Sequence, residues 1–385
     1  MRKYDRRGYY AFVMVAGLFL ASTPMLPGHA VAFAYGVISR FCHKGECKAG
    51  GNPQSGLVMD KAGNLYGTAA GDGIDSEGST FELIADGKKW QRKTLHVFCS
   101  AAHCADGSRP FGTLVVDTAG NLYGTTYGGG GYGYGTVFEL MPNADGSRWK
   151  IRVLHSFCAQ ESCPDGGFPM AGLAYAGQAS GSPYDGSSPL YGTTYQGGAQ
   201  LGDLGVVFEI RPQGKKWSEE TIYSFCSQNA CIDGSWPIAG VTIDASSNLY
   251  GTTSSGGDND SGVVFELSQQ HHGQWSEDVL YSFCSLTDCA DGADPYAGVM
   301  RIPREICTVR QRKVASNAAT TTRNVASFSS WCPTAPKRFF TIFAPSRTAV
   351  TVPFHMAGSS WIRPEIYMEL RLMAEIAKTA GCCLN

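Results

Sequence analysis

The stretch DTAGNLYGT, from Asp117 to Thr125, decides the fold because it recurs along the 385-residue chain. The pattern returns as DKAGNLYGT at residues 60–68, as DASSNLYGT at 244–252 and, shortened to LYGT, at 190–193. Each copy is accompanied by a G-x-[TV]-F-E-[LI] segment, a tryptophan, a Phe-Cys pair, a second cysteine and a proline. The sequence is therefore a tandem repeat, and a residue that occurs once in every copy is required by the repeat unit.

One repeat unit contains the pattern of four antiparallel strands. Residues 113–116 and 122–125 flank the turn sequence D-T-A-G-N at 117–121, which favours a hairpin. The segment 136–140 alternates with period two and predicts a third strand, and 149–157 alternates again and predicts a fourth. Gly, at 48 residues, is enriched at the turns between these segments.

The repeat length and the hairpins predict an all-β fold, a β-propeller-like tandem repeat of four-stranded units of about 58 residues. The alternative is a β-solenoid, whose shorter rungs of about 20 to 30 residues carry parallel strands instead of hairpins. One interval is longer because of a Gly/Ser/Pro-rich insert at 176–188, for which we expect a surface loop. Four full units and a partial first one lie between Phe41 and Met300, so we expect an incomplete propeller.

The combination of D-x-x-G-N-L-Y-G-T-T with a downstream G-[TV]-V-F-E-L resembles the GloVer tandem repeat of exported bacterial proteins that have a choice of C-terminal anchors. The resemblance covers Phe41 to Met300 and is specific, because several motifs recur together at fixed spacing. It implies an exported, propeller-like repeat protein without an established biochemical activity. The chain departs from the family pattern in that no C-terminal anchor is recognisable in it.

The N-terminal residues 1–34 have the pattern of a signal peptide. Basic residues precede an apolar run from Tyr9 to Ala21, which is shorter than a membrane span and is followed by prolines and small residues. We expect cleavage after Ala32 or Ala34 and a mature chain that is secreted, periplasmic or on the cell surface, with no membrane span. With 31 lysines and arginines against 33 aspartates and glutamates, the chain has no basic surface for nucleic acid.

Every repeat carries two cysteines in the spacing C-x4-C. An exported chain meets an oxidising compartment, and the spacing lets the two cysteines bridge locally, so we expect disulfides within each repeat. Zinc would require ligands from two repeats, and its familiar spacing is C-x2-C. An Asp-Gly between the cysteines and the proline is interpreted as a turn and not as a calcium site, and no cofactor is expected. The expected disulfide residues are Cys42, Cys47, Cys99, Cys104, Cys158, Cys163, Cys226, Cys231, Cys284 and Cys289.

The sequence shows no group of potential catalytic residues that departs from the repeat pattern. His96 and His155 occupy a slot that holds tyrosine in other copies, so the slot requires a ring rather than a base. We therefore expect an exported non-catalytic binding or scaffold protein, with a secreted carbohydrate-active enzyme on a propeller as the alternative. The partner is unknown, with a glycan or a protein ligand as the classes considered. The candidate ligand-facing aromatic residues are Tyr127, Tyr132, Tyr134 and Tyr195.

Residues 301–385 lack repeat character, and we interpret them as a frameshifted, poorly ordered tail. Reading the third base of each codon with the first two of the next allows codons 301–313 to encode D-S-P-G-N-L-Y-G-T-T-A-E-G. In the same alternative frame, codons 325–332 allow G-V-V-F-E-L-V-P. Both strings belong to the repeat pattern, so the tail is expected to replace further repeats.

Overall fold

The fold is known from a computed structural model, which describes residues 37–41, 51–71, 77–87, 89–198, 203–214, 216–270, 273–302, 305–308, 311–313, 327–331 and 338–341. The expected signal peptide at 1–34 and the Cys42 and Cys47 pair lie outside the described residues. The described part is all-β, with short 3-10 turns and no α-helix. None of its helical turns has the length and apolar character that crossing a membrane requires.

The repeat region consists of antiparallel four-stranded sheets, one for each repeat. In each sheet the strands follow in chain order, so each unit is a simple meander of neighbouring hairpins. The strands are β1 (Val58–Met59), β2 (Leu65–Ala69), β3 (Ser79–Asp86) and β4 (Lys89–Val97); β5 (Val115–Val116), β6 (Leu122–Thr126), β7 (Thr136–Pro142) and β8 (Trp149–Ser156); β9 (Ala174–Tyr175), β10 (Leu190–Thr194), β11 (Val206–Gln213) and β12 (Lys216–Ser224); and β13 (Thr242–Ile243), β14 (Leu249–Thr252), β15 (Val263–Gln269) and β16 (Trp275–Ser282).

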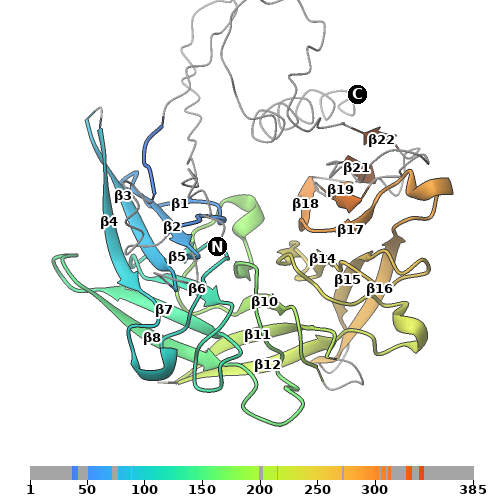
Figure 1. Ribbon diagram of the computed structural model, residues 1–385, viewed down its shortest axis with the longest axis horizontal. Helices are drawn as coiled ribbons and strands as arrows, with labels where there is room; N and C mark the ends of the chain where they lie inside the picture. Colours follow the sequence, from blue (N-terminus) through green and yellow to red (C-terminus); the bar gives the residue numbers. More distant parts are fainter. Residues whose placement is uncertain are drawn as a thin grey trace, which may run out of the picture.

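The sheets follow one another around a common centre, with their fourth strands on the outside (Figure 1). Neighbouring sheets touch through inner strands, as β1 touches β5 and β9 touches β13. They also touch through outer strands, as β4 touches β8 and β8 touches β12. This arrangement of tandem four-stranded units is propeller-like, as the hairpin pattern predicts.

The hairpin turn of the repeat motif is held by its aspartate. Asp117 Oδ1 accepts hydrogen bonds from the backbone N–H of Ala119 and of Asn121, both at 2.8 Å. The Tyr123 hydroxyl lies 3.1 Å from Asp117 Oδ2 and 3.1 Å from Glu139 Oε1. Burial, together with the two carboxylates, raises the pKa of Tyr123 well above its ordinary value. The motif therefore keeps Asp, Asn, Tyr and Glu because the four side chains form one hydrogen-bonded group.

The glycine of the L-Y-G-T segment makes room for an aromatic ring. Gly124 pairs across the sheet with Phe138, and a Cβ atom on Gly124 would lie 2.8 Å from Phe138 Cζ and 2.8 Å from Leu114 Cδ2. Such distances are too short for carbon atoms that are not bonded, so a side chain at Gly124 would displace the ring. Phe138 and its equivalents in the next two repeats, Phe208 and Phe265, belong to the core between the sheets.

The insert at 176–188 is only partly a surface loop, which corrects the expectation from its composition. Residues 178–183 are exposed, but Tyr184 is buried, with 1% of its surface exposed. Its ring stands edge-on to Tyr123 at a centroid distance of 5.2 Å, and its carbonyl accepts a hydrogen bond from Thr118 N–H. The insert therefore covers the hairpin turn of the preceding repeat.

Strands continue beyond the last repeat sheet. β18 (Val299–Ile302), β19 (Glu305–Thr308), β21 (Ser327–Trp331) and β22 (Arg338–Thr341) form a further antiparallel sheet in chain order, and β17 (Ala293–Pro295) pairs with β20 (Gln311–Lys313). The frameshifted origin of residues 301–385 concerns the reading frame and stays a prediction.

Candidate functional site

The cysteines of the described repeats are bridged within each repeat. The Cα atoms of each pair lie 3.9 to 4.1 Å apart. The disulfides join Cys99 to Cys104, Cys158 to Cys163, Cys226 to Cys231 and Cys284 to Cys289. Each bridge closes a short loop at the end of an outer strand.

The aspartate of the Asp-Gly pair anchors this loop. Asp233 is fully buried, and its Oδ2 accepts hydrogen bonds from Ser227 N–H at 2.8 Å and from Ser227 Oγ at 2.9 Å. The Tyr223 hydroxyl donates to the same oxygen at 2.8 Å. These contacts give the aspartate a structural role in the turn, which agrees with its interpretation as a turn residue.

The position that holds histidine in some repeats and tyrosine in others contacts the aspartate of the Asp-Gly pair in its own repeat. His96 Nε2 lies 2.9 Å from Asp106 Oδ2, in the place where the Tyr223 hydroxyl meets Asp233. Burial lowers the pKa of His96, and Asp106 opposes that effect only in part. Burial alone would raise the pKa of Asp106, but hydrogen bonds from Ser100 and Ala101 outweigh it and leave the pKa below its usual range. The slot therefore requires a ring that carries a polar atom.

Aromatic residues gather where the second and third repeats meet. The ring of Phe168 lies 4.9 Å from that of Tyr127 and 5.0 Å from that of Tyr134. Its backbone N–H donates to the Tyr134 carbonyl at 2.7 Å, and its carbonyl accepts a hydrogen bond from Tyr195 N–H at 3.2 Å. Tyr195 in turn lies 6.2 Å from Trp236, at the junction of the third and fourth repeats. We call Tyr127, Tyr134, Phe168, Tyr195 and Trp236 the aromatic loop surface.

Two members of the aromatic loop surface hold an unusual backbone conformation. Phe168 and Trp236 both have φ +57°, and each precedes the proline of its repeat. A bulky residue at positive φ is strained, and such strain tends to gather at functional sites. The corresponding residues of neighbouring repeats, Arg109 and Asp294, share the conformation without the aromatic ring. The rings at this position are therefore not required by the repeat.

The aromatic residues singled out from the sequence differ in exposure. Tyr132 is 55% exposed and Tyr134 is 37% exposed, whereas Tyr127 and Tyr195 are half-buried. The structure brings Tyr127 and Tyr134 together on the ring of Phe168. Sequence reasoning did not identify Phe168 or Trp236 as members of this surface. The available signal was an aromatic residue directly before the repeat proline, where the other copies carry Asn, Arg or Asp.

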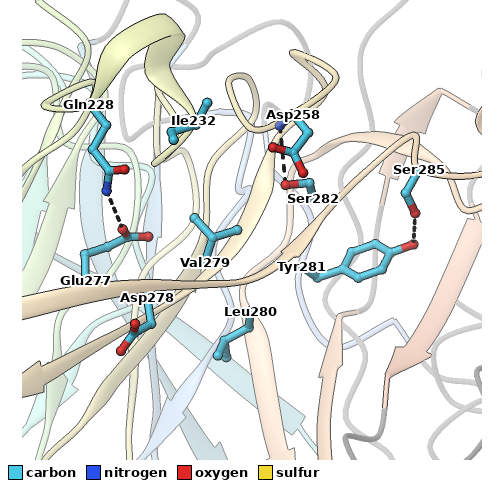
Figure 2. Close-up of a pocket in the computed structure, with 10 residues that line it drawn as sticks. All are labelled: Gln228, Ile232, Asp258, Glu277, Asp278, Val279, Leu280, Tyr281, Ser282 and Ser285. Carbon is cyan, nitrogen blue, oxygen red and sulfur yellow. Dashed lines mark hydrogen bonds between the residues drawn. The ribbon is translucent and has the colours of Figure 1, made fainter.

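A groove with a volume of about 580 Å³ lies beside β16. Figure 2 shows Gln228 reaching toward Glu277 across it, with Nε2 and Oε2 3.5 Å apart. Among the described residues, no hydrogen-bond partner meets the buried Oε1 of Glu277. Burial, followed by the charges of Asp233 and Asp278, raises the pKa of Glu277 to about 8. The groove is lined by Gln228, Ile232, Asp258, Glu277, Asp278, Val279, Leu280, Tyr281, Ser282 and Ser285.

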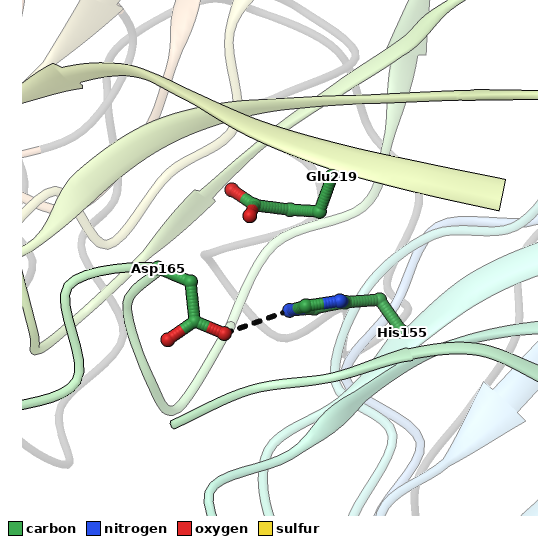
Figure 3. Close-up of side chains that lie close together, drawn as sticks. All are labelled: His155, Asp165 and Glu219. Carbon is green, nitrogen blue, oxygen red and sulfur yellow. Dashed lines mark hydrogen bonds and ion pairs between the residues drawn. The ribbon is translucent and has the colours of Figure 1, made fainter. Parts of the chain in front are cut away.

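Three potential metal ligands from two repeats converge between β8 and β12. His155 Nε2 lies 2.8 Å from Asp165 Oδ2, and Glu219 points toward both (Figure 3). One ligand atom from each residue lies within 4.8 Å of the others. Burial, together with Asp165, raises the pKa of Glu219 to about 7, while His155 acts in the opposite direction. Sequence reasoning missed Glu219 because it belongs to the next repeat.

Comparison with known proteins identifies the repeat. A family model described as the Gloeobacter/Verrucomicrobia repeat matches residues 34–186 and 175–306. No curated protein matches the chain. Among solved structures, a protein of unknown function from Dyadobacter fermentans DSM 18053 is 12% identical, with 80% of this chain and 78% of that chain covered and a TM-score of 0.33. The structure of YjhT is 11% identical, with 76% and 98% covered and a TM-score of 0.25.

Proposed function

The chain belongs to the Gloeobacter/Verrucomicrobia repeat family, and from this premise we propose that it is an exported, non-catalytic binding or scaffold protein of the cell envelope or extracellular space. Export is supported by the signal-peptide pattern of residues 1–34. It is also supported by the cysteine pairs, because disulfides persist in oxidising compartments outside the cytosol.

The ligand is proposed to dock on the aromatic loop surface, and a glycan is the class that fits it best. Aromatic rings offer flat apolar faces, and tyrosine adds a hydroxyl for hydrogen bonding. The observation that carries the proposal is the pair Phe168 and Trp236, which hold bulky rings at φ +57° where other repeats place Arg or Asp. Because Arg109 and Asp294 hold the same conformation without a ring, the repeat sets the backbone, and the rings are specific to these two junctions.

A glycan array with the full chain, followed by calorimetry on each bound glycan, tests the proposal. The variants Phe168→Arg and Trp236→Asp introduce the residues found at 109 and 294, which hold the same backbone conformation, so both should fold. Each is expected to weaken binding about tenfold or more, as loss of an aromatic anchor does. The control Leu286→Ala, at an exposed apolar residue outside the surface, should bind as the wild type does.

Binding that survives both aromatic substitutions would contradict the docking surface. Capture of a protein ligand in place of a glycan, lost in the same two variants, would keep the surface and change the ligand class. Release of reducing sugar from a bound glycan would contradict the non-catalytic part of the proposal.

We also propose that residues 301–385 are translated from a shifted reading frame, so that the parent protein continued with further repeats. The alternative frame of codons 301–313 and 325–332 supports this origin, because it permits two separate motifs of the repeat in the correct order.

A further inference from the structure

The cluster of His155, Asp165 and Glu219 combines residues that other repeat junctions do not combine. Glu219 pairs with Ile210 in its sheet, and the residue at the same register position in the preceding repeat is Ile151, which pairs with Leu140. The junction between β4 and β8 therefore has His96, Asp106 and Ile151. The junction between β12 and β16 has Tyr223, Asp233 and Glu277, since Glu277 pairs with Leu267.

Among the described junctions, an imidazole and two carboxylates therefore come together only between β8 and β12. The side chains of His155 and Asp165 are 21% and 15% exposed, so an ion from solvent could reach them. The charged groups that act on Glu219 are His155, Asp165 and Glu220. The surroundings are thus rich in negative charge, which a cation would balance.

We propose that His155, Asp165 and Glu219 bind one divalent transition-metal ion and that Zn²⁺ is the best match. Imidazole nitrogen and carboxylate oxygen are both ordinary zinc ligands, and three protein ligands leave a fourth tetrahedral position for water. Calcium would need six to eight oxygens, which these three side chains do not supply. The ion would replace the hydrogen bond between His155 Nε2 and Asp165 Oδ2, which are already 2.8 Å apart.

The bound ion would join two repeats through their side chains. His155 lies on β8, Asp165 lies in the disulfide loop that follows it, and Glu219 lies on β12 of the next repeat. A metal bridge would therefore add a specific link to the apolar packing between these two sheets. Because metal binds the folded chain and not the separated strands, it should raise the melting temperature.

Equilibrium dialysis of the full chain against ZnCl₂, with metal measured by mass spectrometry, tests the site. Free thiols are alkylated first, because thiolates also bind zinc. The wild type is expected to bind one ion for each chain. The variants His155→Tyr and Glu219→Ile should each lower the affinity about a hundredfold or more, because each removes a direct ligand. Both place the residue of a neighbouring junction into the cluster, so the fold should tolerate them.

The matched control is His96→Tyr, the same change at the junction where Ile151 holds the register position that Glu219 holds in the next sheet. It should leave zinc binding unchanged. The proposal is overturned if the wild type binds no stoichiometric zinc, if His155→Tyr binds as tightly as the wild type, or if His96→Tyr loses as much affinity as His155→Tyr. Should His155→Tyr fail to fold, Glu219→Gln provides the second variant: ZnCl₂ is expected to raise the melting temperature of the wild type and not of Glu219→Gln, and an equal rise in both would overturn the site.

Discussion

The ring of Phe157 stands edge-on against the ring of Phe208, with their centroids 5.1 Å apart. Phe157 precedes the cysteine that ends one repeat, and Phe208 lies in the F-E strand of the next, so the contact joins two sheets. Phe98 meets Phe138, and Phe225 meets Phe265, in the same way at 5.0 Å. Each repeat thus completes the core of its neighbour, as expected for an array whose units cannot bury their apolar faces alone.

The substitution Phe208→Ala should lower the free energy of unfolding by about 3 to 5 kcal/mol, because Phe208 is fully buried and its loss leaves a cavity. Urea denaturation followed by tryptophan fluorescence measures the change. The control Tyr132→Ala, at a residue that is 55% exposed, should change stability by less than about 0.5 kcal/mol. Equal losses in the two variants would show that the inter-sheet ring contact is not a main source of stability.

The substitution Gly124→Ala should destabilise the chain by about 1 to 3 kcal/mol, since the added methyl group would overlap the Phe138 ring. Gly131→Ala is the matched control, because the added Cβ there would lie 3.9 Å from its nearest neighbour, Ser156. Thermal melts of the two variants compare the same chemical change with and without an overlap. A stable Gly124→Ala variant would mean that Phe138 can move at little cost.

The strands of one repeat could be predicted from the sequence, because they depend on local patterns. The expected strands at 122–125 and 136–140 correspond to β6 (Leu122–Thr126) and β7 (Thr136–Pro142). The convergence of His155 with Glu219 could not be predicted, because it depends on how two sheets pack and not on the period within either. The burial of Tyr184 was missed for a similar reason. The composition of the insert is that of a polar loop, but Tyr184 packs against the hairpin turn of the preceding repeat.

The substitution Glu277→Gln should stabilise the chain at pH 8 and have little effect at pH 4. The pKa of Glu277 is about 8 in the folded chain, against about 4.3 for an unperturbed glutamate. Between these values the folded state holds a proton that the unfolded state has lost, so stability falls as the pH rises through this window. Glutamine mimics the protonated form and removes that loss.

The gain at pH 8 should be on the order of 1 kcal/mol, discounted because Glu277 borders an open groove. Urea unfolding at pH 4, 6 and 8 measures it. The control Glu161→Gln, at an exposed residue, should give a difference from the wild type that does not grow with pH. A Glu277→Gln variant whose stability follows the wild type at all three values would rule out a protonated Glu277.

Peptide mapping of the unreduced protein should find each C-x4-C pair bridged within its own repeat, including the pair Cys42 and Cys47. Spacing and the oxidising compartment are the reasons. The double variant Cys158→Ser and Cys163→Ser should cost about 2 kcal/mol, since the ring that the bridge closes is small. Bridges that join different repeats, or zinc held by these cysteines, would contradict the prediction.

Resequencing of the gene should find a repeat-encoding alternative frame after codon 300. Phe98, Phe157 and Phe225 each pack on a phenylalanine of the next repeat, whereas Phe283 is buried against Tyr250, Val264 and Val299. The alternative frame would place a phenylalanine in the F-E strand of the following repeat, because it permits G-V-V-F-E-L-V-P across codons 325–332.

Inserting one base near codon 301 should therefore restore a next repeat and raise the melting temperature, because one more aromatic pair alone adds about 0.5 to 1.5 kcal/mol beyond its burial. Limited proteolysis should trim the present chain to about residue 300 and spare the restored one, because the sequence after residue 300 lacks the repeat pattern through which each unit packs on its neighbour. Synonymous recoding of codons 301–332 leaves the present protein unchanged and is the control. A DNA sequence whose alternative frame fails to encode G-N-L-Y-G-T-T near codons 304–310 would exclude the frameshift, because this motif opens the repeat that the alternative frame is proposed to encode.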